Sequence, residues 1–278
     1  MKRLLVGAVA LLFGAPVFAA DLYPYARGVV PVTLPNNWNG WYVGLNAGGA
    51  INDSVYDLNP SGCFLTGCGG GGIPGNAFRQ YSSGVSGAGF TGGAQVGYNY
   101  HFAPLWVAGL ETDFNYNGLR KTDNVTTSLG APLFAPGSSF SHSVSTDLDW
   151  FGTFRGRVGF LATPNLMLYG TGGLAYGQVE STAIATFPSP GLGDTYIGST
   201  SKTRIGWAAG AGAEWLISGG WSVKAEYLYL DLGHADYANG CVSPAAICGA
   251  ASPPAYQTSV DTREHIARVG VNYHFPQW

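Results

Sequence analysis

Four acidic and five basic side chains stand at alternate positions within short, otherwise apolar stretches of the chain. Carboxylates held close together could perform general acid–base chemistry, whereas carboxylates beside guanidinium or ammonium groups could form ion pairs. Which of the two applies depends on the elements that position these side chains. The acids are Glu111, Asp113, Glu214 and Glu226, and the bases are Arg155, Arg157, Arg204, Lys224 and Arg268.

The stretches that carry these charges alternate apolar and polar residues with a period of two. This pattern is typical of β-strands with two different faces. Eight such stretches occur between Trp41 and Phe275, although the fifth, over 166–179, is rich in glycine and ambiguous in phase. In the last one, the apolar face is formed by Ala267, Val269, Val271, Tyr273 and Phe275, and the other face by Arg268, Gly270, Asn272 and His274.

Short and long connections alternate strictly between the eight predicted strands. Short turns are expected at 103–104, 162–165 and 218–220, and long loops at about 48–90, 119–147, 181–201 and 233–262. Bacterial outer-membrane barrels combine short periplasmic turns with long outer loops in this way. We therefore expect an all-β fold, an eight-stranded antiparallel up-and-down transmembrane β-barrel, with both chain ends in the periplasm.

The apolar face of each predicted strand has no charged residues, which is the reverse of a soluble barrel. In lipid every backbone amide needs a partner, so a sheet must be closed, and its apolar face must meet hydrocarbon. Aromatic residues also gather near both ends of the strands, as expected for belts at the two membrane interfaces. We assign to these belts Trp41, Trp106, Trp150, Trp215, Trp221 and Phe275.

The charged faces must then line a narrow lumen, because an eight-stranded barrel is just wide enough to be filled by its own side chains. A lone charge there would be too costly, so the acids and bases must pair. We predict an ion-pair network that plugs the lumen, rather than a substrate site between carboxylates. The expected network contains Glu111, Asp113, Arg155, Arg157, Glu214, Lys224, Glu226 and Arg268.

The N-terminal region and the composition indicate an exported protein. Residues 1–19 have the cationic start, apolar core and small terminal residues of a secretory signal peptide. Residues 20–37 form a proline-containing segment expected in the periplasm, and 38–278 form the barrel. Charged residues are only 10% of the chain, and 13 Lys+Arg against 16 Asp+Glu give no basic excess. Nucleic acid is therefore not an expected partner.

Four cysteines occur as two local pairs, Cys63 with Cys68 and Cys241 with Cys248. In an exported chain this arrangement favours disulfides, and closure within each loop is simpler than pairing between loops, which stays open. The spacings lie outside those usual for structural zinc sites. We expect no metal, cofactor or catalytic set, the weaker alternative being an outer-loop metal site at Asp231, His234 and Asp236.

Several strand sequences resemble those of a known family. They are residues 37–48 (NWNGWYVGLNAG), 93–100 (GAQVGYNY), 168–177 (LYGTGGLAYG) and 269–275 (VGVNYHF). They resemble the small outer-membrane surface proteins of Gram-negative bacteria called outer-membrane immunogenic or opacity-like β-barrel proteins. The resemblance covers the signal peptide and the barrel but not the loops, and it implies a structural or host-facing role without catalytic residues. One departure is that Pro276-Gln277-Trp278 follow Phe275, so either aromatic could be the assembly signal.

The expected function is that of a structural surface protein of the cell outer membrane, which supports the envelope and interacts through its outer loops. Two alternatives remain: a narrow porin-like channel for small solutes, and a surface ligand binder. The resemblance implies haem as one such ligand, because some members of that family are described as haem binders, and His142 and His234 are the candidate ligands here. Expected partners are outer-membrane lipid and lipopolysaccharide, the outer-membrane assembly machinery, and host or surface ligands.

Overall fold

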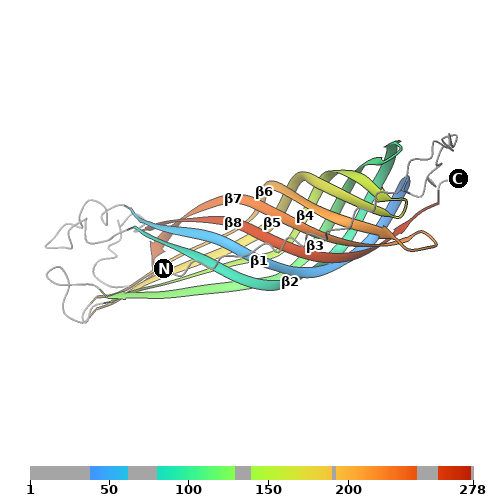
Figure 1. The fold of residues 1–278 in the computed structure, drawn as a ribbon. Coiled ribbons are helices and arrows are strands. Elements are labelled where there is room, and N and C mark those ends of the chain that lie inside the picture. The colour runs from blue at the N-terminus through green and yellow to red at the C-terminus, as the bar shows by residue number, and fades with distance from the viewer. Residues whose placement is uncertain (1–37, 62–79, 129–138, 190–191, 243–255, 277–278) are drawn as a thin grey trace, which may run out of the picture. The chain divides into compact units, whose positions relative to one another are not determined.

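Eight antiparallel strands close into a barrel, as predicted. The computed structural model describes residues 38–61, 80–128, 139–189, 192–242 and 256–276. Consecutive strands pair in chain order, and β1 also pairs with β8, so the barrel is closed (Figure 1). The strands are β1 (Gly40–Pro60), β2 (Tyr81–Ala103), β3 (Trp106–Ser128), β4 (Ser139–Thr163), β5 (Leu166–Ser189), β6 (Leu192–Leu216), β7 (Trp221–Cys241) and β8 (Tyr256–His274).

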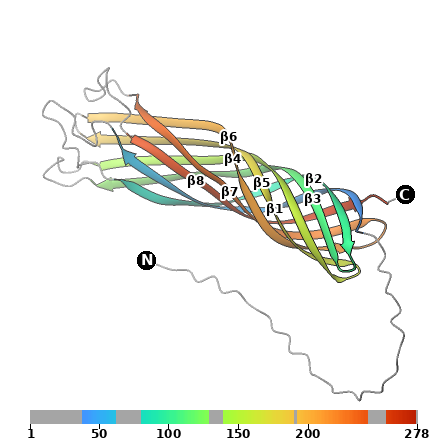
Figure 2. The ribbon, with the colours of Figure 1, turned by 90° about the horizontal axis from the view of Figure 1, so that it is seen from above.

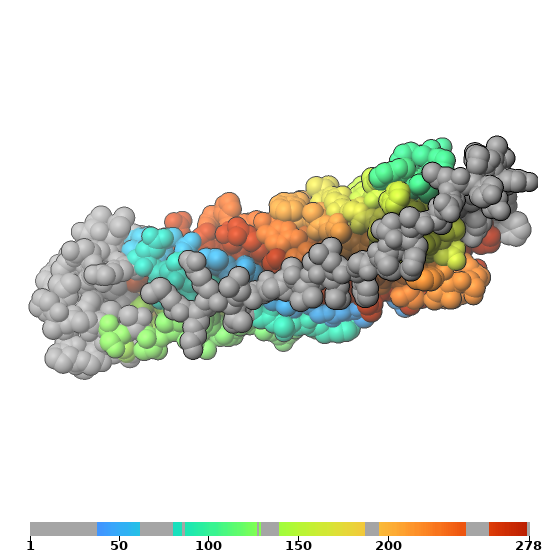
Figure 3. Space-filling view, in the orientation of Figure 1, coloured from blue at the N-terminus to red at the C-terminus, as the bar shows by residue number. Residues whose placement is uncertain are grey.

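The apolar faces point outward and the charged faces inward. On β8, Val269 is 61% exposed, whereas Arg268 beside it is 3% exposed. The same contrast holds on β4, where Phe154 is exposed and Arg155 is fully buried. On the face shown in Figure 3, side chains of the first and last strands meet in one continuous wall. Among the described residues, no helix is long and apolar enough to cross a membrane.

The strands reach much further than the sequence indicates. They contain 19 to 25 residues, about twice the 9–11 that a tilted strand needs to cross a bilayer. The predicted long loops at 48–90, 119–147, 181–201 and 233–262 are therefore wrong at their ends; β1, for example, continues to Pro60 and β2 begins at Tyr81. Outside the bilayer the outward face no longer needs to be apolar, so the alternation disappears while backbone pairing continues.

The outer part of the wall divides into two groups of four strands. Pairing of β2 with β3 stops at Thr91 and Asn117. Between Ile197 and Trp207, β6 has no partner on β7. One group contains β7, β8, β1 and β2, and the other contains β3, β4, β5 and β6; in Figure 1 the green β3 leaves the side of β2 at this height. Figure 2 shows that the strands are steeply tilted in the membrane half and run nearly straight beyond it.

The interior is layered from the end with the short turns, which the sequence predicts to be periplasmic, to the opposite end. A hydrophobic cluster that includes Trp38, Met167 and Tyr169 closes the end near the short turns. The charged residues follow, and above them lies a second apolar cluster that includes Leu119, Phe151 and Leu228. A third cluster fills the outer extension and is rich in tyrosine. Packed side chains of the described residues therefore occupy the interior at each of these levels.

Candidate functional site in the barrel lumen

Arg155 stands at the centre of the charged layer. One of its terminal nitrogens, Nη2, lies 2.6 Å from Glu111 Oε1 and 2.9 Å from Asp113 Oδ2. The other, Nη1, lies 3.1 Å from Glu226 Oε1, and Nε donates to Thr153 Oγ1. The guanidinium is fully buried. Its planar fork with several donors suits this task, because it can bind carboxylates on more than one side at once.

Two further bases complete the same cluster from the opposite wall. Arg268 Nη2 lies 2.7 Å from Asp113 Oδ2 and 2.5 Å from Glu226 Oε2. Lys224 Nζ donates to both oxygens of Glu111 at 3.1 Å. Glu111 is in β3 and Lys224 in β7, so these ion pairs cross the lumen and join strands that are not neighbours in the sheet.

Arg157 and Glu214 form the periplasmic side of the network. Arg157 Nη1 lies 3.0 Å from Glu214 Oε2, and its guanidinium carbon lies 4.5 Å from the centre of the Tyr42 ring. Glu214 Oε1 also accepts hydrogen bonds from Ser222 and Asn272, and lies 3.1 Å from His274 Nε2. Tyr42 links the two halves, because its hydroxyl donates to Glu111 Oε2 at 2.7 Å.

The structure brings all eight predicted lumen residues into one connected network, with four acids facing four bases. Every carboxylate in it is held by buried cations, which leaves no free acid–base pair. The arrangement therefore stabilises the barrel across its interior. Removing one partner of such a pair would leave a charge buried alone, at a cost of about 3–5 kcal/mol.

Arg204, the fifth base expected in the lumen, is not part of this network. Its Nη1 donates to the backbone carbonyl of His234 at 2.8 Å, across the unpaired stretch between β6 and β7. The strand alternation predicted the inward direction of Arg204 correctly, but β6 and β7 are not paired at this height. The side chain therefore fills the seam instead of crossing the interior.

The predicted belt residues lie on the outward face. Near the short turns, Trp41 packs edge-on against Tyr98 and Trp106 against Phe160. Trp221 meets Tyr273 there, and Trp215 and Phe275 are also exposed. Towards the outer side, Trp150 stacks on Phe114 with ring centres 5.3 Å apart, and Trp207 packs against Tyr229. We call these two rings the periplasmic girdle and the outer girdle.

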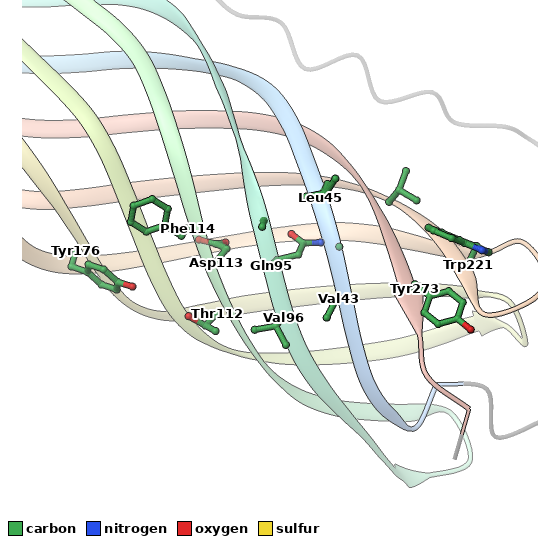
Figure 4. Close-up of a pocket in the computed structure, with 13 residues that line it drawn as sticks. Val43, Leu45, Gln95, Val96, Thr112, Asp113, Phe114, Tyr176, Trp221 and Tyr273 are labelled. Atoms are coloured by element: carbon green, nitrogen blue, oxygen red, sulfur yellow. The ribbon is translucent and has the colours of Figure 1, made fainter. Parts of the chain in front are cut away.

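A shallow apolar hollow lies on the wall between these two girdles (Figure 4). Its sides include Trp221 and Tyr273 from the periplasmic girdle and Phe114 from the outer one. Short side chains such as Val43 and Val96 line it between the aromatic rings. The lining also includes Gln95 and Asp113, whose side chains belong to the inward face of the same strands.

Sequence reasoning missed two inward residues, Tyr42 and Glu264, which are fully buried. His274 was placed on the face of Arg268, as the structure has it, but was not included in the predicted network. Glu264 shares the phase of Arg268 on the last strand, so the period-two pattern could have found it. Tyr42 was hidden because a tyrosine counts equally well as an apolar or as an interfacial residue.

A second polar cluster lies in the outer extension, beyond the outer girdle. Tyr56 donates to Asp123 Oδ2 at 3.0 Å, and its hydroxyl lies 3.1 Å from His142 Nε2. The Tyr81 ring is 4.1 Å from the His142 ring. Burial lowers the pKa of His142, although the Asp123 carboxylate opposes this, and burial raises the pKa of Tyr56. The cluster joins four strands where β2 and β3 are not paired.

Other predicted sites fall outside this arrangement or outside the described residues. Cys241 is disulfide-bonded, but Cys63, Cys68 and Cys248 lie outside the described residues, so pairing within the loops stays a prediction. His234 lies 3.8 Å from Asp236 on the exposed surface. Within the described ranges, no group of three or more His, Cys, Asp or Glu could hold a metal ion.

Comparison with known proteins gives the same architecture. The family described as "Outer membrane protein beta-barrel domain" matches residues 6–275. The chain belongs to this family. As a member of this family, it is a protein of the cell outer membrane, as predicted from the resemblance of its strands.

Its relatives include the 31 kDa outer-membrane immunogenic protein of Brucella melitensis, 34% identical over 99% of this chain and 100% of the relative. The 25 kDa outer-membrane immunogenic protein of Brucella abortus is 26% identical over 99% of both chains. Among solved structures, the outer membrane protease OmpT from Escherichia coli gives a TM-score of 0.45 at 10% identity, over 86% of this chain and 97% of OmpT. A match at that level supports no argument about this chain.

Proposed function

We propose that this family member is a non-enzymatic surface protein whose closed barrel carries its outer strands and loops beyond the membrane. The observation that carries the proposal is the filled lumen. The charged layer is packed between two apolar clusters, and the four acids and four bases all hold one another. With the interior occupied, the outer extension is the part of the protein available for interactions.

The same observation weighs against the narrow channel that the sequence left as an alternative. An ion crossing the barrel would have to pass the apolar layer that includes Leu119, Phe151 and Leu228. It would also have to separate Arg155 from carboxylates at 2.6 to 3.1 Å. Both steps place a charge in a poorly solvated interior, which is costly.

Conductance measurements test the proposal. The purified protein, reconstituted in planar lipid bilayers, is expected to give no stable conductance steps. A matched variant that removes one cross-lumen pair with both partners, Glu111→Ala with Lys224→Ala, is expected to give no stable steps either, because the apolar clusters on both sides of the charged layer are unchanged. Stable steps from the unmodified protein would contradict the closed lumen.

Two classes of partner follow from the proposal. Lipid and lipopolysaccharide would surround the wall between and just above the girdles, and host or surface ligands would meet the loops. The relatives named immunogenic support exposure of these loops to the outside. The assembly machinery remains a proposed partner at the periplasmic end.

The haem-binding alternative is weakened for one of its two proposed ligands. His142 is 2% exposed and its Nε2 contacts Tyr56, so it does not face a ligand. His234 is exposed and remains available. A haem titration in which the spectral change survives His234→Ala would remove this residue as well.

A further inference from the structure

Glu264 is a buried acid outside the ion-pair network. It lies in the inward row of β8, four residues before Arg268, and is fully buried. Leu230 of β7 is its register partner on one side, and Ile266 follows in the inward row. Both belong to the apolar cluster above the charged layer, so Glu264 lies within that cluster.

Its two oxygens are not equally satisfied. Oε2 accepts a hydrogen bond from Asn117 Nδ2 at 2.8 Å, whereas Oε1 has no partner. On the other side of β8, the register partner of Glu264 is Asn52 of β1, which is 1% exposed. Asn52 Oδ1 also has no partner. Two buried acceptors therefore project inward from directly opposed positions, and no described residue donates to either of them.

No basic side chain of the described residues supplies that donor. Arg268 on the same strand is held by Asp113 and Glu226. On β3, the stem of Lys121 packs near Gly87, and no ion pair joins its ammonium group to Glu264. Asp231, beside Leu230 on β7, points outward and pairs with Arg263. An ionised Glu264 would thus be a buried charge without a counter-ion, which proteins avoid.

We propose that Glu264 is a proton-binding site, in which the neutral carboxylic acid donates through Oε1 to Asn52 Oδ1. A protonated carboxyl has one O–H donor and keeps acceptor capacity, so it satisfies both unpartnered oxygens and still accepts from Asn117. The result is an uncharged hydrogen-bonded link between β1, β3 and β8 inside the apolar layer.

A bound cation is the competing occupant of the same place, and the number of ligands disfavours it. Calcium takes six to eight oxygen ligands and magnesium six. Here Glu264 Oε1 and Asn52 Oδ1 are the two unpartnered oxygens at this height among the described residues, and apolar side chains surround them. A proton needs one donor position and one acceptor, which these two residues provide.

Matched substitutions of two buried acids test the inference. Glu264→Gln keeps a neutral donor towards Asn52, so its unfolding temperature in detergent is expected to equal that of the unmodified protein. Glu226→Gln removes the charge that faces Arg155 and Arg268, so it is expected to unfold roughly 10 °C lower. Equal losses in both variants, or a loss in Glu264→Gln that depends on added calcium or magnesium, would overturn the proposal.

Infrared spectroscopy of the unmodified protein gives a second readout that does not depend on variant stability. The carbonyl stretch of a protonated carboxyl is expected at neutral pH, absent in Glu264→Gln and shifted in Asn52→Ala. A spectrum without that band would show that Glu264 is ionised and would overturn the assignment. The outcome is independent of the conductance test, because a neutral Glu264 is compatible with either result there.

Discussion

At the scale of single residues, the lumen separates two kinds of buried acid. Glu111, Asp113, Glu214 and Glu226 are held by cations, whereas Glu264 has an amide on one side and an unpartnered amide oxygen on the other. The same residue type therefore serves as a charged link in one layer and as a neutral link in the next. Which one it becomes is decided by the presence or absence of a base on the facing strand.

Arg155 is the residue whose loss should be most damaging. We predict that Arg155→Ala lowers the free energy of unfolding by about 3–5 kcal/mol, because three carboxylates would lose their shared partner. Urea-induced unfolding in lipid or detergent measures this. Arg204→Ala is the matched control, since its contact is one backbone carbonyl at the seam. Equal effects of the two changes would contradict a central role for Arg155.

His142 gives the outer extension a dependence on pH. Burial holds its pKa below the usual 6.5, so the unfolded chain binds a proton more readily than the folded one. The stabilisation is therefore present at neutral pH and lost as the pH falls below 6.5. We predict faster hydrogen exchange near Tyr56 and Asp123 in acid.

His142→Phe is the control for this effect, because phenylalanine keeps the ring between Tyr81 and Phe140 but cannot take up a proton. Its exchange rates in the outer extension are expected to be less sensitive to acid. Acid sensitivity equal to that of the unmodified protein would show that another group is responsible.

At the scale of the strands, glycines on the inward face make room for the network. Gly97 on β2 lies under the Tyr42 ring, and a Cβ there would be 2.2 Å from the Tyr42 hydroxyl and 2.7 Å from the Leu110 carbonyl. We predict that Gly97→Ala displaces Tyr42 from Glu111 and lowers the free energy of unfolding by about 1–3 kcal/mol. Gly170→Ala is the control, because nothing lies within 4 Å of its added carbon.

The membrane half of each strand could be predicted from the sequence because its two faces lie in two different environments. Lipid requires an apolar residue outside, and the narrow lumen requires polar or small residues inside. Apolar and polar or small residues therefore alternate throughout this part of the strand. The set of charged residues that meet in the lumen follows from this phase, whereas the partner of each one does not. Arg204 shows the limit, because the alternation gives the direction of a side chain but not where the wall opens.

The outer half could not be read in the same way. On β4, Ser141, Ser143 and Ser145 face outward, and His142, Val144 and Thr146 are buried. Both faces contain polar or small residues because water lies outside and a mixed core inside. At the β2–β3 seam the pairing ends at Thr91 and Asn117, and at the β6–β7 seam the register shifts between Ile197 and Trp207. Both features depend on pairing between distant residues and leave no local pattern.

At the scale of the whole molecule, accessibility to labels distinguishes the two ends of the barrel. Among the described residues no cysteine is free, and the labelling of the unmodified protein by a thiol reagent that cannot cross membranes gives the background for the variants. We predict that Asn124→Cys, on the outer half of β3, is labelled on intact cells. Ser218→Cys, in the short turn before β7, should be labelled only after the outer membrane is opened. The reverse result would invert the topology.

The extension of the strands beyond the outer girdle also affects which parts of the protein an antibody could bind. From Tyr229 in the outer girdle to Cys241 at the end of β7 there are twelve residues of continuous strand, or about 40 Å along the chain. A binding protein could therefore recognise rigid, paired backbone far above the lipid headgroups as well as the loops at the tip. An epitope on these outer strands would contain no loop residues, so changes confined to the loops would leave its residues in place.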